Sequence, residues 1–149
     1  MNKTRILPPT CLFISLAGMV LLNLFMPVVT LIPYPWNATG LIPMAVGMAL
    51  NTIAGKAFIK SGNSIRAFER PEKLLTSGVY KYSRNPMYLG MVLILVGVAV
   101  LLGTLSPFII VPVFAIAMDR VFVIAEEEIL EQHFGEQWTQ YRAEVRRWL

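Results

Sequence analysis

The chain has 149 residues, of which 56% are hydrophobic and 15% charged, and its formal net charge is +4. An average soluble domain is about 45–50% apolar and about 25% charged, so this composition argues against an ordinary soluble globule and against intrinsic disorder. The single cysteine excludes an intramolecular disulfide. The cations flank apolar runs and do not form a stripe with interleaved aromatics, so we expect a small polytopic membrane protein with no nucleic-acid partner.

The first apolar run, Thr10–Ile32, is uncharged and interrupted only by Asn23 and Pro27. It is long enough to cross a bilayer, which takes roughly 20 helical residues. A cleaved signal peptide is the competing interpretation, because Lys3 and Arg5 precede the run. The apolar stretch exceeds the about 7–15 residues usual for a signal and no small-x-small cleavage site follows it, so we expect a retained helix.

Three further apolar runs predict spanning helices, over residues 40–59, 87–102 and 107–125. In the first of these, Gly47, Asn51 and Gly55 recur every four residues and would form a small, polar stripe that lets membrane helices approach closely. Gly90 and Gly97 offer a similar face on the next helix. The last two helices are joined by only four residues, which predicts an antiparallel hairpin.

The cations predict the orientation of these helices. The segment Lys56–Arg84 holds seven cations, and others lie near the N-terminus and after the last span, whereas loops 33–39 and 103–106 have none. By the positive-inside rule, all cationic segments face the cytoplasm. We therefore expect an all-α, multi-pass integral membrane protein with four spans, both termini cytoplasmic, and a single domain over 1–149. A cytoplasmic connector and a C-terminal amphipathic helix would carry any chemistry.

The connector ends at Asn85-Pro86, a typical helix start in which Asn caps and Pro occupies the first turn. A well-capped membrane helix with a basic flank explains this pattern without any function. It leaves unexplained the density of Tyr80, Tyr82 and Tyr88 around the cap. A helix N-terminus with an arginine and several aromatic faces could hold a ligand that carries both anionic and cationic groups.

The last span runs into an acidic segment. On a straight helix Arg120 shares a face with Glu127, and Asp119 shares a face with Glu126. Adjacent carboxylates point about 100° apart on a helix of 3.6 residues per turn, and no His or Cys has suitable spacing, so we expect no metal site. The alternative to a functional role is a helix that leaves the lipid and becomes solvated.

The tail begins with a helix that Gly135 is expected to break. Beyond it, apolar residues at helical spacing make an amphipathic segment with arginines on the other faces. They are Trp138, Tyr141, Val145 and Trp148. This segment suits the membrane surface, and it could equally pack against the connector.

Four motifs of the C-terminal half occur in one order. They are Leu-Leu-Thr-Ser-Gly-Val-Tyr at 74–80, Arg-Asn-Pro-Met-Tyr-Leu-Gly at 84–90, Glu-Glu-x-x-Leu-x-x-x-Phe-Gly at 126–135, and Tyr141 followed by Val-Arg-Arg-Trp-Leu at 145–149. Together they resemble the membrane-integral methyltransferases, namely the isoprenylcysteine carboxyl methyltransferase family and the related phospholipid N-methyltransferases. The resemblance implies methyl transfer from S-adenosyl-L-methionine to a lipid or to a lipidated small molecule or peptide, without a Rossmann domain.

The resemblance also implies site residues, in segments 70–90 and 120–149. Those expected to bind the cofactor are Glu72, Lys73, Leu74, Leu75, Tyr80, Asn85, Pro86, Met87, Tyr88 and Glu126. Glu127 lies beside them, and an amine acceptor would need Glu127 or a tyrosine as its base. An arginine linked to substrate in the isoprenylcysteine enzymes falls at Phe122 here, and Arg120 is the nearby candidate to replace it.

Other classes remain possible at this point. A non-catalytic membrane protein, such as a transport or assembly factor, could retain the same fold. A transporter usually shows a repeat between its halves and polar residues near mid-bilayer, and this chain has no apparent repeat. A third alternative is an interaction protein that uses its basic tail on anionic lipid. The acceptor and the oligomeric state are left open.

Overall fold

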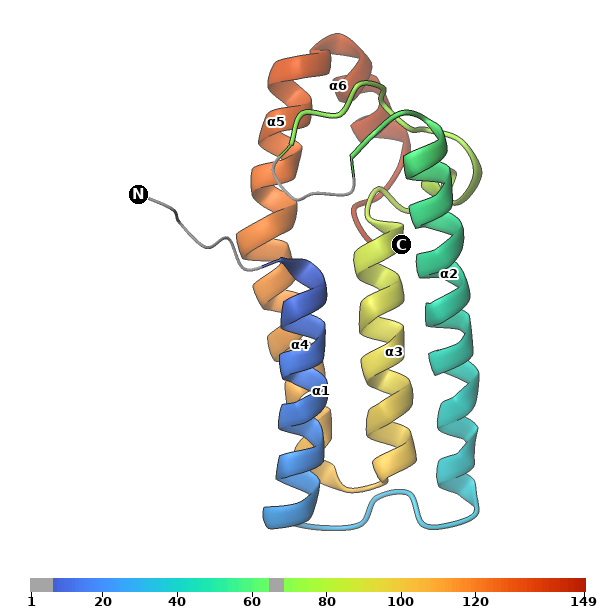
Figure 1. Cartoon of the computed structure of the whole chain (residues 1–149), viewed down its shortest axis with the longest axis vertical. Helices are drawn as coiled ribbons and strands as arrows, with labels where there is room; N and C mark the ends of the chain where they lie inside the picture. The colour runs from blue at the N-terminus through green and yellow to red at the C-terminus, as the bar shows by residue number, and fades with distance from the viewer. Residues whose placement is uncertain (1–6, 65–68) are drawn as a thin grey trace.

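The structure is a computed structural model that describes residues 7–64 and 69–149 (Figure 1). The regular elements in these ranges are helices, with one isolated antiparallel bridge between Thr30 and Thr104, so the all-α fold class is confirmed. The elements in chain order are α1 (Pro8–Phe25), η1 (Trp36–Gly40), α2 (Leu41–Lys60), η2 (Gly78–Lys81), α3 (Pro86–Leu102), α4 (Leu105–Met118), η3 (Asp119–Val123), α5 (Ile124–Phe134) and α6 (Glu136–Glu144).

The helices have the length and composition of a polytopic membrane protein. Three helical stretches are long and apolar enough to cross a membrane, Pro8–Phe25, Trp36–Lys60 and Leu105–Phe134, and α3 is a shorter apolar helix. Their outward side chains are large and apolar, such as Phe13 on α1 and Ile42 on α2, both more than 60% exposed. Exposed apolar surface on this scale is stable in lipid and unfavourable in water.

The first helix is shorter than the predicted run, which extended to Ile32. α1 ends at Phe25. The residues on either side of Pro27 are not helical: Met26 ends the helix, and Val28 has a φ of 60°. Proline has no N–H to donate and disfavours helical geometry at the residue before it. The residues after α1 instead lie against the α3–α4 turn, where Leu31 and Ile32 donate to the Gly103 carbonyl.

Close backbone contact holds α2 against α3, as the glycine spacing predicts. A Cβ on Gly90 would lie 2.8 Å from the Gly47 carbonyl oxygen, and one on Gly97 would lie 2.6 Å from that of Gly40. Asn51 adds a hydrogen bond of 3.0 Å from its side-chain amide to the Met87 carbonyl. Gly55, the third member of the predicted stripe, has no neighbour within 4 Å of an added Cβ.

The remaining helices complete the bundle around an apolar core. α3 and α4 form the predicted antiparallel hairpin, in which Gly103 takes a φ of 73°. α1 packs on α4 and α3, and Met19, Leu95 and Phe114 from the three helices are buried together. The Thr104 hydroxyl closes this end of the bundle with a 2.6 Å bond to the Asn23 side-chain oxygen.

The described segments that carry charge meet at the opposite end of the bundle. The C-terminal end of α2, the connector, the start of α3, and α5, α6 and the C-terminus lie there together (Figure 1). Residues far apart in the sequence are thereby brought to one place, above the ends of apolar helices. Which side of the membrane this end faces stays a prediction.

Candidate functional site

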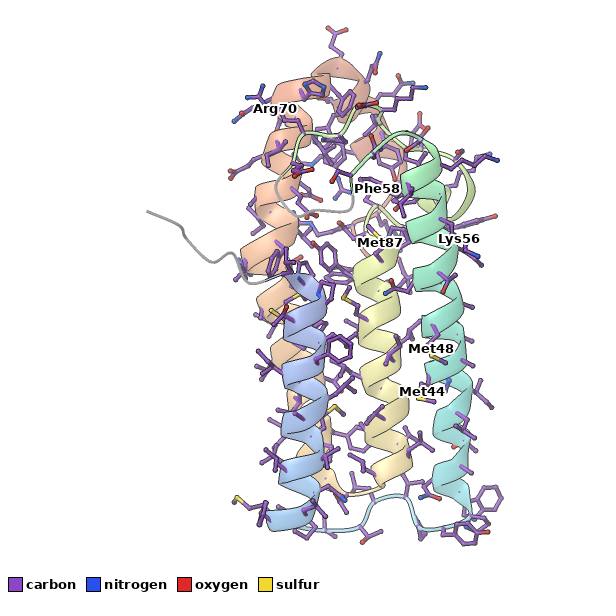
Figure 2. All side chains as sticks on the ribbon, in the orientation of Figure 1. Met44, Met48, Lys56, Phe58, Arg70 and Met87 are labelled. Carbon is purple, nitrogen blue, oxygen red and sulfur yellow. The ribbon has the colours of Figure 1, made fainter. Side chains whose placement is uncertain are left out.

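A cavity of about 480 Å³ lies at the charged end of the bundle. It is enclosed by the start of α1, the last turns of α2, the connector, the start of α3, and α5 and α6. Phe58 of α2 and Met87 of α3 border it and lie beside the connector (Figure 2). The predicted cofactor residues that line it are Lys73, Leu74, Leu75, Tyr80, Asn85, Pro86, Met87, Tyr88 and Glu126. Glu127 also lines the cavity, whereas Glu72 and Arg120 do not.

The connector is fixed over the cavity by a buried asparagine. The side chain of Asn63 donates to the Lys73 carbonyl at 2.9 Å and accepts from the Lys73 amide at 3.0 Å. This reciprocal pair gives Lys73 the hydrogen bonds that a strand neighbour would supply, and so positions Leu74 and Leu75 against the cavity. Sequence reasoning missed Asn63, because a lone asparagine after a helix carries no distinguishing signal.

The tail helix α6 packs against the connector, which is the second of the two arrangements considered for it. Trp138 and Tyr141 are buried, and the Tyr141 hydroxyl donates to the Tyr80 carbonyl at 2.7 Å. Gly135 ends α5 with a φ of 51°, as predicted. Burial raises the pKa of both phenols, that of Tyr141 to about 12, so both stay neutral at physiological pH.

Tyr88 and Glu126 form a hydrogen-bonded pair on the cavity wall. The Tyr88 hydroxyl donates to Glu126 Oε1 at 2.9 Å. Among residues 7–64 and 69–149, no lysine, arginine or histidine forms an ion pair with Glu126. A carboxylate in such surroundings favours a cationic partner, since burial without one is costly.

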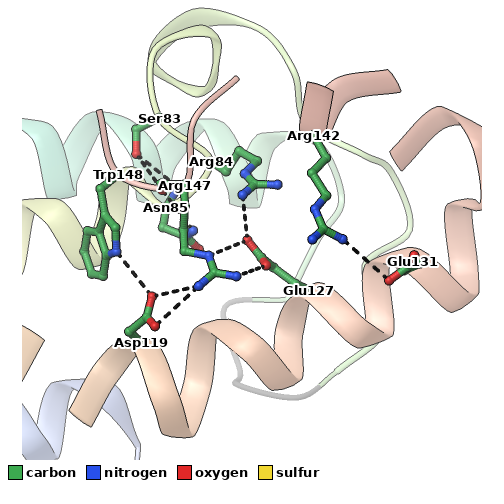
Figure 3. A network of polar contacts seen from close by, with 9 residues as sticks. All are labelled: Ser83, Arg84, Asn85, Asp119, Glu127, Glu131, Arg142, Arg147 and Trp148. Carbon is green, nitrogen blue, oxygen red and sulfur yellow. Dashed lines mark hydrogen bonds and ion pairs between the residues drawn. The ribbon is translucent and has the colours of Figure 1, made fainter. Parts of the chain in front are cut away.

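Glu127, the next residue, has the opposite environment (Figure 3). Arg84 Nη2 lies 3.2 Å from its Oε1, and Arg147 contacts both of its oxygens, at 3.2 Å and 2.7 Å. Arg147 also reaches Asp119 at 3.3 Å, so one guanidinium joins two carboxylates. Burial lowers the pKa of Arg84 and Glu127 opposes that shift, while hydrogen bonding to Glu127 raises the pKa of Arg147. The cluster is charge-balanced and fixes the C-terminus to α5.

The last residues of the chain fasten the start of α3. We call residues 145–149 the C-terminal clasp. The Arg146 carbonyl accepts from the Arg84 amide at 3.1 Å, and the Arg147 carbonyl accepts from the side chains of Asn85 at 3.1 Å and Ser83 at 3.4 Å. The prediction that the Asn85 side chain caps α3 is therefore wrong: it makes no cap bond and binds the clasp.

The predicted faces of the acidic segment are also wrong, because residues Asp119–Val123 are π-helical. A π-turn holds more residues than an α-turn and shifts every later side chain around the axis. As a result Asp119 shares a partner, Arg147, with Glu127, and the side chain of Arg120 is 74% exposed. Arg120 pairs with Asp119 at 3.8 Å and does not border the cavity, so we assign it no role there.

The comparison with known families bears directly on this arrangement. The sequence model of phospholipid methyltransferases matches residues 36–137, more than half of the chain. The chain belongs to the phospholipid methyltransferase family. The matched range runs from η1 to the first residues of α6 and includes most of the cavity wall. Tyr141 and the C-terminal clasp lie outside that range.

Two relatives are similar to parts of the chain. It is 33% identical over 75 residues to the protein-S-isoprenylcysteine O-methyltransferase of Schizosaccharomyces pombe, a match that covers 48% of this chain and 30% of that protein. It is 35% identical over 63 residues to an uncharacterized protein of Haemophilus influenzae, covering 42% of this chain and 100% of that protein. The resemblance to membrane-integral methyltransferases is thereby confirmed at the level of the family.

Proposed function

We propose that the chain transfers a methyl group from S-adenosyl-L-methionine to a lipid or lipidated acceptor at the membrane surface. The observation that carries the proposal is the convergence of nine of the predicted cofactor residues on one cavity at the end of an apolar bundle. Membership of the phospholipid methyltransferase family supports the reaction class. The apolar bundle supports an acceptor drawn from the bilayer.

The residues around the cavity fit this cofactor chemically. The cavity has a volume of about 480 Å³, and sites for small molecules usually have volumes of about 300–1,000 Å³. Glu126 offers a carboxylate that no described cation neutralises, suited to the cofactor's ammonium or ribose hydroxyls. The faces of Tyr80 and Tyr88 suit a sulfonium, because aromatic faces attract cations. When bound, this cofactor supplies a methyl group that its positive sulfonium already activates.

The protein residues then have to align the acceptor with that methyl group and exclude water, which can account for much of the rate enhancement. The clasp and the Asn63 pair hold the connector and the start of α3 in fixed positions around the cavity. Glu127 has both oxygens occupied by arginine nitrogens, so we assign it to positioning and not to proton removal.

The acceptor side of the cavity is apolar and faces the bundle. Leu7, Pro8 and Pro9 at the start of α1 and Gly55 and Ile59 on α2 border it. An acceptor with a hydrophobic tail can therefore keep its tail among the helices while its reactive group reaches the polar residues. Both phospholipid amines, by the family, and isoprenylcysteine carboxylates, by the relative, are proposed acceptors.

A binding experiment with matched glutamate variants tests the cofactor assignment. We expect calorimetry on detergent-purified protein to detect S-adenosylmethionine binding that Glu126→Gln weakens about tenfold or more, since a charge-assisted contact contributes about 1.5–3 kcal/mol. Glu128→Gln is the control, because Glu128 is exposed and outside the cavity. Equal affinity in the wild type and the Glu126 variant would contradict the assignment.

A further inference from the structure

Arg84 is a buried cation that its protein partners satisfy only in part. Its side chain is 8% exposed, and Nη2 forms the ion pair with Glu127. Its Nε and Nη1 are enclosed and have no hydrogen-bond partner within the described ranges. The same is true of Trp138 Nε1. Three unpaired donors therefore lie on two side chains, both of which border the cavity.

These two side chains are in contact at the border of the cavity, and together they make one corner of it. The Arg84 guanidinium carbon lies 5.4 Å from the centre of the Trp138 ring. More than about 90% of buried polar groups in folded proteins have a partner, and each one that lacks it costs about 1–3 kcal/mol, more when charged. A cluster of unpaired donors bordering a cavity is therefore a site that a ligand acceptor would complete.

The unpaired donors of this corner suit an anionic hydrogen-bond acceptor. The Glu127 carboxylate stabilises the charged form of Arg84, whereas the guanidiniums of Arg142 and Arg147 destabilise it. Glu127 is already shared with Arg147, which takes both of its oxygens. Glu126, a carboxylate on the cavity wall, accepts a hydrogen bond from Tyr88. The cavity thus has one wall suited to a cation and one corner suited to an anion.

We propose that Arg84 and Trp138 form an oxyanion subsite that takes the carboxylate of the methyl donor's amino-acid group. This inference rests on the proposed function. A donor that carries an ammonium and a carboxylate matches the two kinds of polar wall, and the planar carboxylate offers two oxygens to the unpaired donors. Both residues border the cavity in which that donor is proposed to bind.

The test compares two ligands that differ only in this group. S-adenosylmethionine and its decarboxylated form are titrated by calorimetry against wild type, Arg84→Lys and Trp138→Phe. The lysine variant keeps a cation near Glu127 and removes the unpaired donors, and the phenylalanine variant keeps an aromatic ring and removes its N–H. We expect wild type to bind the decarboxylated form about tenfold more weakly, a difference of about 1.4 kcal/mol. Both variants should lose most of that discrimination, with little change for the decarboxylated form.

Several outcomes would overturn the subsite. Equal affinity of the wild type for both ligands would contradict the subsite, whether or not the variants fold. Equal losses for both ligands in the variants would show a structural role only. A variant that keeps its affinity for S-adenosylmethionine but raises the KM for phospholipid acceptor would assign the corner to the acceptor phosphate. Wild type that binds neither ligand would contradict the proposed function itself.

Discussion

Glu126 and Glu127 are neighbours in the chain but serve different purposes in the structure. Glu126 receives a hydrogen bond from Tyr88 and faces the cavity, whereas Glu127 is held by Arg84 and Arg147. The family resemblance that the acidic motif helps to carry predicted both at the cofactor site, and both line the cavity. It did not distinguish them, because their partners lie far away in the chain and two of the contacts depend on the C-terminal clasp.

Tyr141 provides a prediction on pH at the scale of one residue. Burial raises the pKa of its phenol to about 12, above the about 10 of an exposed tyrosine. Its hydrogen bond to Tyr80 therefore stabilises the fold fully below pH 10 and is lost as the pH rises through 12. We expect wild type to exceed Tyr141→Phe in unfolding free energy by about 1 kcal/mol at pH 8, and the difference to shrink toward pH 12.

Denaturant unfolding in detergent, followed by tryptophan fluorescence at pH 8 to 12, measures this difference. Subtracting the Tyr141→Phe curve from the wild-type curve removes the contributions of other groups that titrate in the same range. A difference that stays constant across the range would contradict a role for the neutral phenol.

Among the elements, the C-terminal clasp has the clearest link between position and site. It binds Ser83, Arg84 and Asn85 through backbone carbonyls and Glu127 through Arg147. Carbonyl acceptors have no sequence signature, which is why the role of Asn85 was predicted as a helix cap. The π-helical segment likewise has no composition signal. Its shift of the later side chains made the prediction that Arg120 and Glu127 share a face wrong.

Two adjacent arginines allow a matched test of the clasp. Arg147 joins Glu127 to Asp119, whereas the Arg146 side chain is exposed and only its backbone contacts Arg84. We expect Arg147→Ala to lower the free energy of unfolding by about 1–3 kcal/mol, because the buried Glu127 loses a partner. Arg146→Ala should change it by less than about 0.5 kcal/mol. Denaturant titration of the two variants in one detergent decides, and equal effects would contradict the role of Arg147.

Glycine spacing predicted a close-packing face on each of α2 and α3, and the contact between these two helices offers a second test at this scale. A Cβ on Gly90 would lie 2.8 Å from the Gly47 carbonyl and 3.1 Å from the Asn51 amide, so Gly90→Ala forces the helices apart. We expect a loss of about 1–3 kcal/mol, typical of overpacking. Gly55→Ala is the control, since no atom lies within 4 Å of its added Cβ and alanine is the better helix former. Thermal unfolding in detergent should show a clear fall for Gly90→Ala only.

For the whole molecule, composition and charge were sufficient to predict an all-α membrane protein and the end of the bundle at which its charged segments meet. Apolar runs are a strong signal, because lipid leaves few alternatives to a helix. The exact end of α1 was not predictable from hydropathy, since Met26–Ile32 is as apolar as the helix before it and Pro27 decides the boundary. The cavity depends on contacts between the connector, α5 and the clasp that no single segment encodes.

The orientation of the molecule follows from the same charges and can be tested directly. The positive-inside rule places the end with the connector, α6 and the C-terminus in the cytoplasm. Single cysteines introduced at Ser77 and Thr39, in a Cys11→Ser background, probe opposite ends of the bundle. In intact cells we expect a membrane-impermeant thiol reagent to label the cysteine at 39 and not the one at 77. Labelling of the cysteine at 77 alone would show that the orientation is the reverse of the predicted one.

The central claim is methyl transfer to a hydrophobic acceptor at the cavity. The most direct measurement incubates purified protein with S-adenosylmethionine labelled in its methyl group and total membrane lipid extract, then identifies the labelled product by mass. We predict a labelled lipid product from wild type and from Glu128→Gln, and its loss in Glu126→Gln. Absence of any labelled lipid or lipidated product with wild type, under conditions in which the protein stays folded, would contradict the account.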